Sequence, residues 1–263
     1  MADDNQAEAH EEYDDRMLKL LQIIWGDGFL SPGGPQAVRE IVSGIDLKDK
    51  AVLDVGCGVG GLDEILAGEF GAKVIGVDVA ALIVKLGQER IAASPLKDRI
   101  EIRKIEPGPL PFADGSFDVV FGKDAWLHIP DKAAFFAELF RVLKPGGIVA
   151  CGDWMKSPGP YSVDMDYFFK VEGLTYHLVT LAEYGQLVHG AGFTDVVLTD
   201  ITDKAAIDAR DELGRMRNTL HPVLTRAIGP KARDFFIEDW RSLTVVLDQG
   251  ELRPARMRAR KPA

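Results

Sequence analysis

The segment Val52-Leu53-Asp54-Val55-Gly56-Cys57-Gly58-Val59-Gly60-Gly61 decides the fold class of this 263-residue chain. The apolar run at 51–55 predicts a buried strand, and the glycines after it predict a tight turn into a helix at 61–70. Glycine lets such a turn approach a ligand because no Cβ stands in the way. The helix that begins there offers backbone N–H donors and a partial positive charge. The segment therefore predicts a ligand-binding strand–turn–helix unit.

The same alternation of strands and helices continues along the chain. Apolar β-branched runs predict strands and longer helical patterns predict helices, with strands at 73–77, 99–104, 117–122 and 147–153 and helices at 35–44, 80–93 and 131–143. This order predicts an α/β fold with a Rossmann-like, mostly parallel sheet, one antiparallel edge strand and flanking helices. In such sheets ligands bind where the strands end.

The two ends of the chain extend this core. Residues 11–25 predict an amphipathic helix, so that 1–34 form an N-terminal capping helix and loop on a domain at 35–263. Prolines and aromatic residues at 155–178 predict a lid or acceptor insertion. The remaining pattern predicts a helix at 180–191, a strand at 195–201, helices at 203–217 and 221–248, and a last strand at 251–260.

Composition excludes several classes of protein. The chain is 46% hydrophobic with a net charge of −10, which argues against disorder and against nucleic acid or anionic membranes as partners. Cys57 and Cys151 are the only cysteines, so neither a disulfide scaffold nor a cysteine metal site is expected, and no metal is expected elsewhere. No apolar run reaches membrane-spanning length and no signal pattern opens the chain, which predicts a cytoplasmic location.

Two carboxylates identify the kind of ligand. Asp78 ends the second strand, 20 residues after Gly58, where it can accept hydrogen bonds from ribose hydroxyls. Asp54 stands two residues before the first glycine, where it can hold an amino group. S-adenosylmethionine carries such a group, whereas a dinucleotide presents a pyrophosphate. Dehydrogenases share the glycine pattern, so an NAD-dependent dehydrogenase stays open at this point.

These residues resemble those of a known class of enzymes. Asp54–Gly61 together with Asp78 resembles the S-adenosylmethionine motif of class I methyltransferases, and Phe-Asp-Val-Val at 117–120 and Leu-Lys-Pro-Gly-Gly at 143–147 resemble later landmarks of that fold. The resemblance implies S-adenosylmethionine as cofactor, S-adenosylhomocysteine as product and a small-molecule methyl acceptor. A non-catalytic protein that binds S-adenosylmethionine is an alternative.

A closer resemblance is to phosphoethanolamine N-methyltransferases. It rests on Trp-Gly-Asp-Gly-Phe-Leu-Ser-Pro-Gly-Gly at 25–34 and Lys-Asp-Ala-Trp-Leu-His-Ile-Pro-Asp-Lys at 123–132. Sarcosine and dimethylglycine N-methyltransferases share the Asp-Ala-x-Leu-His stretch. The resemblance implies that Tyr13 and His128 form a catalytic pair, in which histidine is the base because its unperturbed pKa is about 6.5. It also implies a cofactor site lined by Ser31, Asp54, Gly56, Gly58, Asp78, Val79, Glu106 and Lys123, with Glu106 where the family has an aspartate.

The acceptor site departs from that family. The resemblance places Trp154, Lys170 and Tyr176 around the acceptor, but Trp154 and Lys170 replace tyrosines. Asp124 follows a predicted strand, where its carboxylate can hold a substrate ammonium. Leu174 replaces an arginine, the natural bidentate partner of a phosphate, and the family's C-terminal lysine has no clear counterpart. A small amine with or without an anionic group is therefore predicted. Methylation of sulfur or oxygen, or of a larger acceptor, stays open, as does the oligomeric state.

Overall fold

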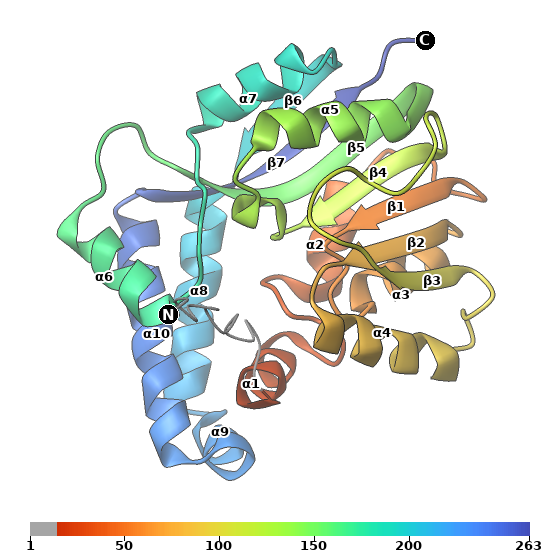
Figure 1. Cartoon of the computed structure of the whole chain (residues 1–263). Helices are drawn as coiled ribbons and strands as arrows, with labels where there is room; N and C mark the ends of the chain where they lie inside the picture. The colour runs from red at the N-terminus through yellow and green to blue at the C-terminus, as the bar shows by residue number, and fades with distance from the viewer. Residues whose placement is uncertain (1–14) are drawn as a thin grey trace, which may run out of the picture.

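A computed structural model describes residues 15–263, which form a seven-stranded sheet flanked by helices (Figure 1). The strands lie in the order β3-β2-β1-β4-β5-β7-β6. Their bounds are β1 Ala51–Val55, β2 Lys73–Asp78, β3 Ile100–Lys104, β4 Phe117–Lys123, β5 Leu143–Lys156, β6 Thr194–Asp200 and β7 Leu252–Arg260. The predicted Rossmann-like α/β sheet is confirmed.

The sheet contains one antiparallel strand. The pairs from β3 through β5 are all parallel, whereas β7 runs antiparallel to both β5 and β6. The last strand is therefore inserted between β5 and the edge strand β6 rather than forming the edge itself. An ion pair between Arg253 and Asp200 ties β7 to the end of β6.

Apolar side chains of the strands form a core on each face of the sheet. Val52 packs with the helices α2, α3 and α4, while its neighbour Leu53 packs on the opposite face with α5 and α7. Both faces are thus covered, as the near-continuous apolar strands require (Figure 1). The bounds of these helices are α2 Gly34–Ile41, α3 Gly61–Gly68, α4 Ala81–Ala93, α5 Lys132–Val142 and α7 Leu181–Gly190.

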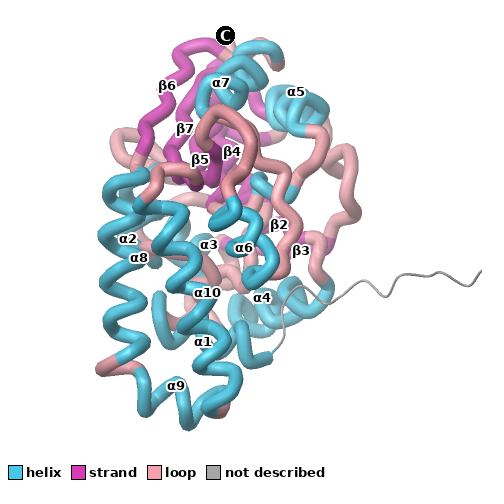
Figure 2. Tube along the Cα trace, turned by 90° about the vertical axis from the view of Figure 1, so that its left-hand side faces the viewer, coloured by secondary structure: helices cyan, strands magenta, loops and turns pink. Residues whose placement is uncertain are grey.

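A second group of helices packs beside the sheet, on the side away from β3 (Figures 1 and 2). The group consists of α1 Asp15–Trp25, α6 Val163–Glu172, α8 Thr202–Arg217, α9 His221–Ile228 and α10 Pro230–Asp248. The indole N–H groups of Trp25 and Trp240 donate to the two oxygens of buried Glu212, at 2.7 and 3.0 Å. This carboxylate therefore joins α1, α8 and α10.

One prediction about this group needs correction. The single helix expected at 221–248 is wrong, because α9 ends at Ile228 and α10 begins at Pro230. Gly229 has φ 82° and ψ 160°, and proline disfavours a helical residue before it, so the chain turns there. The stretch at 155–178, predicted as a lid or acceptor insertion, contains the end of β5 and the helix α6, which Ser162 caps at its N-terminus.

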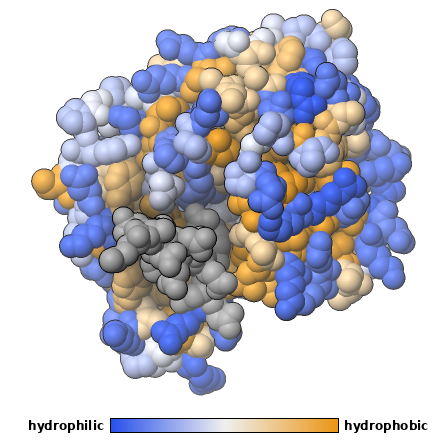
Figure 3. All heavy atoms as spheres, viewed as in Figure 1, coloured by the Kyte–Doolittle hydropathy of each residue, from blue (hydrophilic) through white to orange (hydrophobic). Residues whose placement is uncertain are grey.

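Figure 3 shows hydrophobic residues exposed on one face of the molecule among hydrophilic residues, which lie across its centre as well as at its rim. Within residues 15–263, no helix is both long and apolar enough to cross a bilayer.

The loop between α1 and α2 lies against the start of α3. A Cβ added to Gly61 would stand 2.2 Å from the carbonyl oxygen of Gly28, so two backbones touch here without room for a side chain. This contact brings the N-terminal loop to the edge of the sheet where β1 ends, and it places Ser31 beside the glycine turn.

Gly61→Ala should therefore lower the melting temperature and weaken ligand binding at the glycine turn. The backbone of Gly28 cannot yield as a flexible side chain would, and we expect a loss of about 1–3 kcal/mol of unfolding free energy. The control is Gly214→Ala in α8, where no atom lies within 4 Å of an added Cβ. Alanine there should be neutral or stabilising. Equal stabilities of the two variants in thermal unfolding would contradict the proposed contact.

Candidate functional site

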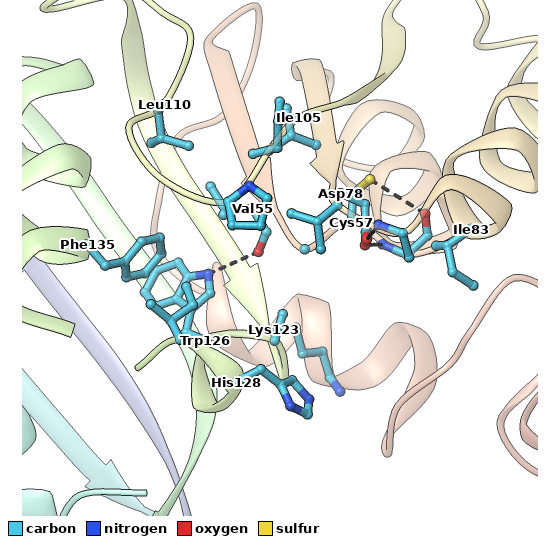
Figure 4. A pocket seen from close by; sticks show the side chains of 18 of the residues that line it. Val55, Cys57, Asp78, Ile83, Ile105, Leu110, Lys123, Trp126, His128 and Phe135 are labelled. Carbon is cyan, nitrogen blue, oxygen red and sulfur yellow. Dashed lines mark hydrogen bonds between the residues drawn. The ribbon is translucent and has the colours of Figure 1, made fainter. Parts of the chain in front are cut away.

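A large cavity lies where β1, β2 and β4 end. Its volume is about 610 Å³, a size typical of sites for cofactors and drug-like ligands. Most of its lining is apolar, including Val55, Ile83 and Leu110, with a few polar groups at its ends. In Figure 4, Asp78 and Cys57 lie on one side of this cavity, while Lys123 and His128 lie together at another.

The glycine turn forms one wall of the cavity. Gly56 has φ 85°, and a Cβ on it would stand 2.2 Å from the Cβ of Ala125, so only glycine fits. Asp78 stands opposite, at the end of β2. Its carboxylate accepts hydrogen bonds from the backbone N–H of Gly58 at 3.1 Å and of Ala80 at 3.0 Å. Burial raises the pKa of Asp78, and these two donors partly oppose that rise.

Asp54 lies behind the turn rather than in the cavity. Its side chain is fully buried and does not line the cavity, so the predicted direct contact with a ligand amino group is not what the structure shows. Its carboxyl group lies against that of Asp63 in α3, and the oxygens of both groups are buried with no other hydrogen-bond partner in the described structure. Burial raises the pKa of Asp54 to about 8 and raises that of Asp63 well above its usual range. The pair therefore keeps at least one proton at neutral pH and supports the turn from behind.

A polar cluster closes the opposite end of the cavity. The Lys123 ammonium donates to Ser31 Oγ at 2.7 Å and forms an ion pair with Asp124. Lys123 is buried and Asp124 has φ 52°, a left-handed conformation that is uncommon outside glycine. The cluster joins the N-terminal loop to the end of β4 and offers a buried cation to an anionic group of a ligand.

His128 lies on a 3-10 turn, η1 Trp126–His128, just after this cluster. Its Nδ1 lies 2.8 Å from the carbonyl oxygen of Thr175. Because a carbonyl oxygen only accepts, Nδ1 carries a proton, and in the neutral ring Nε2 is then the proton acceptor. The imidazole also packs against the ring of Tyr176, with centroids 5.3 Å apart.

Buried groups under the 3-10 turn fix its position. Asp153 accepts hydrogen bonds from the backbone N–H of Leu127 at 3.1 Å and from the hydroxyl of Tyr184 at 3.2 Å. The ammonium of buried Lys132 donates to the carbonyl oxygen of Trp126 at 2.9 Å. Burial raises the pKa of Asp153 to about 7 and lowers that of Lys132. Sequence reasoning missed this network: Lys132 lies in the same motif as His128, but Asp153 comes from β5 and Tyr184 from α7, and no local pattern brings them together.

A second, smaller cavity of about 100 Å³ adjoins the first. The two cavities share four lining residues, Leu30, Ser31, Asp124 and His128. The rest of the second cavity is lined by aromatic and aliphatic residues and by two carboxyl groups, with the full set being Met17, Leu21, Trp25, Pro32, Leu127, Trp154, Phe168, Glu172, Leu174, Tyr176, Asp239, Trp240, Leu243 and Leu252.

The structure brings together most of the residues predicted for the cofactor. Those that line the first cavity are Ser31, Gly56, Gly58, Asp78, Val79, Glu106 and Lys123, with Asp124 and His128. Glu106 stands at its rim, where its side chain is 82% exposed and paired with Lys104. Tyr13 lies outside the described residues.

The residues predicted for the acceptor divide into two groups. Trp154 and Tyr176 line the second cavity, and Asp124 lines both cavities. Lys170 is exposed on α6 and lines neither cavity, so the structure does not place it with the others. Sequence reasoning missed Glu172 and Asp239, because nothing in the sequence shows that α6 and α10 meet at this point.

Comparisons with known proteins agree with this geometry. Residues 53–151 match the model of a methyltransferase domain family. The chain is 38% identical over 206 residues to phosphoethanolamine N-methyltransferase 1 of Arabidopsis thaliana, covering 78% of this chain and 41% of that protein. The chain thus spans less than half the length of this plant relative.

Solved structures show the same fold. Phosphoethanolamine N-methyltransferase 2 of Haemonchus contortus, in complex with phosphomonomethylethanolamine and S-adenosylhomocysteine, superposes with a TM-score of 0.88 and 25% identity, over 96% of this chain and 59% of that one. A putative sarcosine dimethylglycine methyltransferase from Galdieria sulphuraria gives a TM-score of 0.81 at 21% identity, over 95% and 98% of the two chains. The chain contains a class I methyltransferase domain.

The sequence favoured a methyltransferase over a dehydrogenase, and this prediction is confirmed. The matched range 53–151 includes the glycine turn, Asp78, Lys123, Asp124 and His128. Glu172 and Asp239 lie beyond it, so the second cavity joins the matched range of the methyltransferase domain to helices outside it.

Asp54→Asn should flatten the pH dependence of stability. The folded-state pKa values of Asp54 and Asp63 lie above the unfolded value of about 3.9. Their contribution to stability is therefore complete below that value and is lost as pH rises through the folded pKa, about 8 for Asp54. Asparagine cannot ionise, so unfolding free energies from urea titrations between pH 5 and 9 should decline less steeply. The exposed control Asp98→Asn should keep the wild-type slope, and equal slopes for all three proteins would refute this account.

Proposed function

We propose that this chain is an S-adenosylmethionine-dependent methyltransferase that methylates the nitrogen of a small amine. The observation that carries the proposal is the position of His128. Its imidazole lines both cavities, so it faces a cofactor site on one side and an acceptor site on the other. The likeness to phosphoethanolamine N-methyltransferases supports nitrogen as the methylated atom.

The first cavity has the features that S-adenosylmethionine requires. The turn at Gly56 leaves no side chain between the backbone and a ligand, and the Asp78 carboxylate is oriented by two N–H groups toward the position of ribose hydroxyls. Lys123 and Ser31 provide a cation and a hydroxyl for the carboxylate of the methionine part. Ile83, Ile105 and Leu110 provide apolar walls for the adenine.

The second cavity has the size of a small acceptor. When bound, S-adenosylmethionine supplies a methyl group whose bond to sulfur breaks, with the electron pair left on sulfur, as the nitrogen lone pair bonds to the carbon. An alkyl amine is mostly protonated at pH 7, so its nitrogen needs a base to free that lone pair. Nε2 of His128 takes the amine proton, because Nδ1 is held as a donor to the carbonyl of Thr175.

Two further residues contribute to this proposal. Asp124 lines both cavities, where it can accept a hydrogen bond from the amine while Lys123 balances its charge. The resemblance to phosphoethanolamine enzymes assigns Tyr13 as the partner of His128. Tyr13 is therefore part of the proposed catalytic pair.

Asp78→Ala should weaken binding of S-adenosylhomocysteine by about tenfold to a hundredfold. The variant loses a charged acceptor for two hydroxyls, and hydrogen bonds to charged groups contribute about 1.5–3 kcal/mol. Titration calorimetry measures this directly without an acceptor. Asp98→Ala, an exposed aspartate on another loop, should bind like the wild type. Undiminished affinity in Asp78→Ala would remove the ribose contact from the proposal.

His128→Ala should separate catalysis from cofactor binding. We expect turnover to fall by about 10²- to 10⁴-fold, as is common when a general base is removed, while S-adenosylhomocysteine binds within about threefold of wild type. Tyr13→Phe should also lower turnover. The control is His189→Ala, since His189 is exposed on α7. Product formation is measured by mass spectrometry, and near wild-type turnover in both His128→Ala and Tyr13→Phe would overturn the catalytic assignment.

A further inference from the structure

The second cavity contains a pair of carboxyl groups that the proposed reaction does not use. Asp239 comes from α10 and Glu172 from the last turn of α6, and both line this cavity but not the first. The Asp239 residue is 4% exposed, and its carboxyl group hydrogen-bonds with that of Glu172. The hydroxyl of Tyr176 donates to the other side of the pair, 2.9 Å from Glu172 Oε1.

One oxygen of this pair lacks a hydrogen-bond partner. Asp239 Oδ1 is buried and makes no hydrogen bond in the described structure. Burial first, and the charge of Glu172 second, raise the pKa of Asp239 to about 9. One proton shared by two carboxyl groups leaves one negative charge at the cavity wall. An unsatisfied buried carboxyl oxygen is costly unless a ligand donates to it.

Among the described residues, only His128 on the wall of this cavity can carry a positive charge. None of its lining residues among 15–263 is a lysine or arginine, and the undescribed residues 1–14 contain neither type in their sequence. Leu174 lines the cavity and offers no charge, and Lys170 is exposed outside it. A phosphate bearing about −1.5 to −2 charges would meet carboxylates here instead of cations.

The remaining walls suit a cation. Tyr176, Trp154, Phe168 and Trp240 line the cavity, and aromatic faces attract ammonium groups. The volume of about 100 Å³ is smaller than the cavity of about 150 Å³ that accepts benzene in a known engineered case, which limits this part of the ligand to a few heavy atoms.

We infer that the Glu172–Asp239 pair binds a protonated amine at the end of the acceptor remote from the methylated nitrogen. The acceptor class is then a small aliphatic diamine, with no phosphate or other anion. The inference rests on the proposed function, since it places the methylated nitrogen at His128 between the two cavities. The second ammonium donates to Asp239 Oδ1 and to Glu172, and the aromatic walls surround its methylene groups.

Binding to the protein loaded with S-adenosylhomocysteine tests this without turnover. Fluorescence of Trp154 and Trp240, which line the cavity, reports titrations with 1,3-diaminopropane, with 3-amino-1-propanol and with phosphoethanolamine. The first two ligands differ only at one end, where the diamine has an ammonium group and the amino alcohol has a hydroxyl. We expect the diamine to bind at least about tenfold more tightly than the amino alcohol, and phosphoethanolamine to bind most weakly.

Variants assign that preference to the pair. Asp239→Asn should reduce the preference for the diamine over the amino alcohol to within about threefold. If Asp239→Asn fails to fold, Glu172→Gln serves in its place and should reduce the preference to the same extent. Leu174→Arg should weaken the diamine and strengthen phosphoethanolamine, because it puts a cation beside the pair. Asp234→Asn, an exposed residue of the same helix, should leave all three affinities unchanged.

The outcomes separate the two proposals. Tightest binding of phosphoethanolamine, equal binding of diamine and amino alcohol, no binding of any of the three, or a preference that survives both Asp239→Asn and Glu172→Gln would overturn the diamine inference. In those cases S-adenosylhomocysteine still binds and the methyltransferase proposal stands. Failure of S-adenosylhomocysteine itself to bind would overturn the proposed function instead.

Discussion

The site depends on one backbone constraint, the close approach of chain segments around the turn between β1 and α3. Gly56 lies so close to the Cβ of Ala125 that it has no room for a Cβ of its own, and Gly61 touches the carbonyl of Gly28. These contacts put the end of β4 and the N-terminal loop against the same turn. The Lys123–Ser31 hydrogen bond and the position of Asp124 follow from that arrangement, because they join the same two segments. A side chain at either glycine would separate the walls of the large cavity.

Buried carboxyl groups recur around this constraint, and they serve different purposes. Asp54 and Asp63 share a proton behind the turn, where they face no ligand. Glu212 is fully used as an acceptor by two indoles and fixes the helices beside the sheet. Asp239 also keeps one buried oxygen unpartnered, as Asp54 and Asp63 do, but it differs from that pair because it lines a cavity. A buried carboxyl group away from both cavities supports the fold, whereas an open carboxyl oxygen on a cavity wall indicates a ligand.

Much of the cofactor site could be predicted from the sequence because it lies next to strand ends. In a parallel sheet the carboxyl ends of neighbouring strands meet, so Asp78 and Lys123 were bound to lie near the glycine turn. Asp54 shows the limit of this reasoning. Strand periodicity does not reveal whether a carboxylate at a strand end points to the ligand or to the helix behind it, and here it points to Asp63.

By itself, the sequence determined the parallel sheet, the glycine turn and the placement of His128 after β4, since strand periodicity and glycine geometry are local properties of the chain. It missed the break between α9 and α10, although Gly229-Pro230 marks it. Only the tertiary structure decided what surrounds the acceptor. Glu172 and Asp239 are far apart in the sequence, and their contact, the exposure of Lys170 and the shape of the second cavity depend on how α6 and α10 pack, which no local pattern specifies.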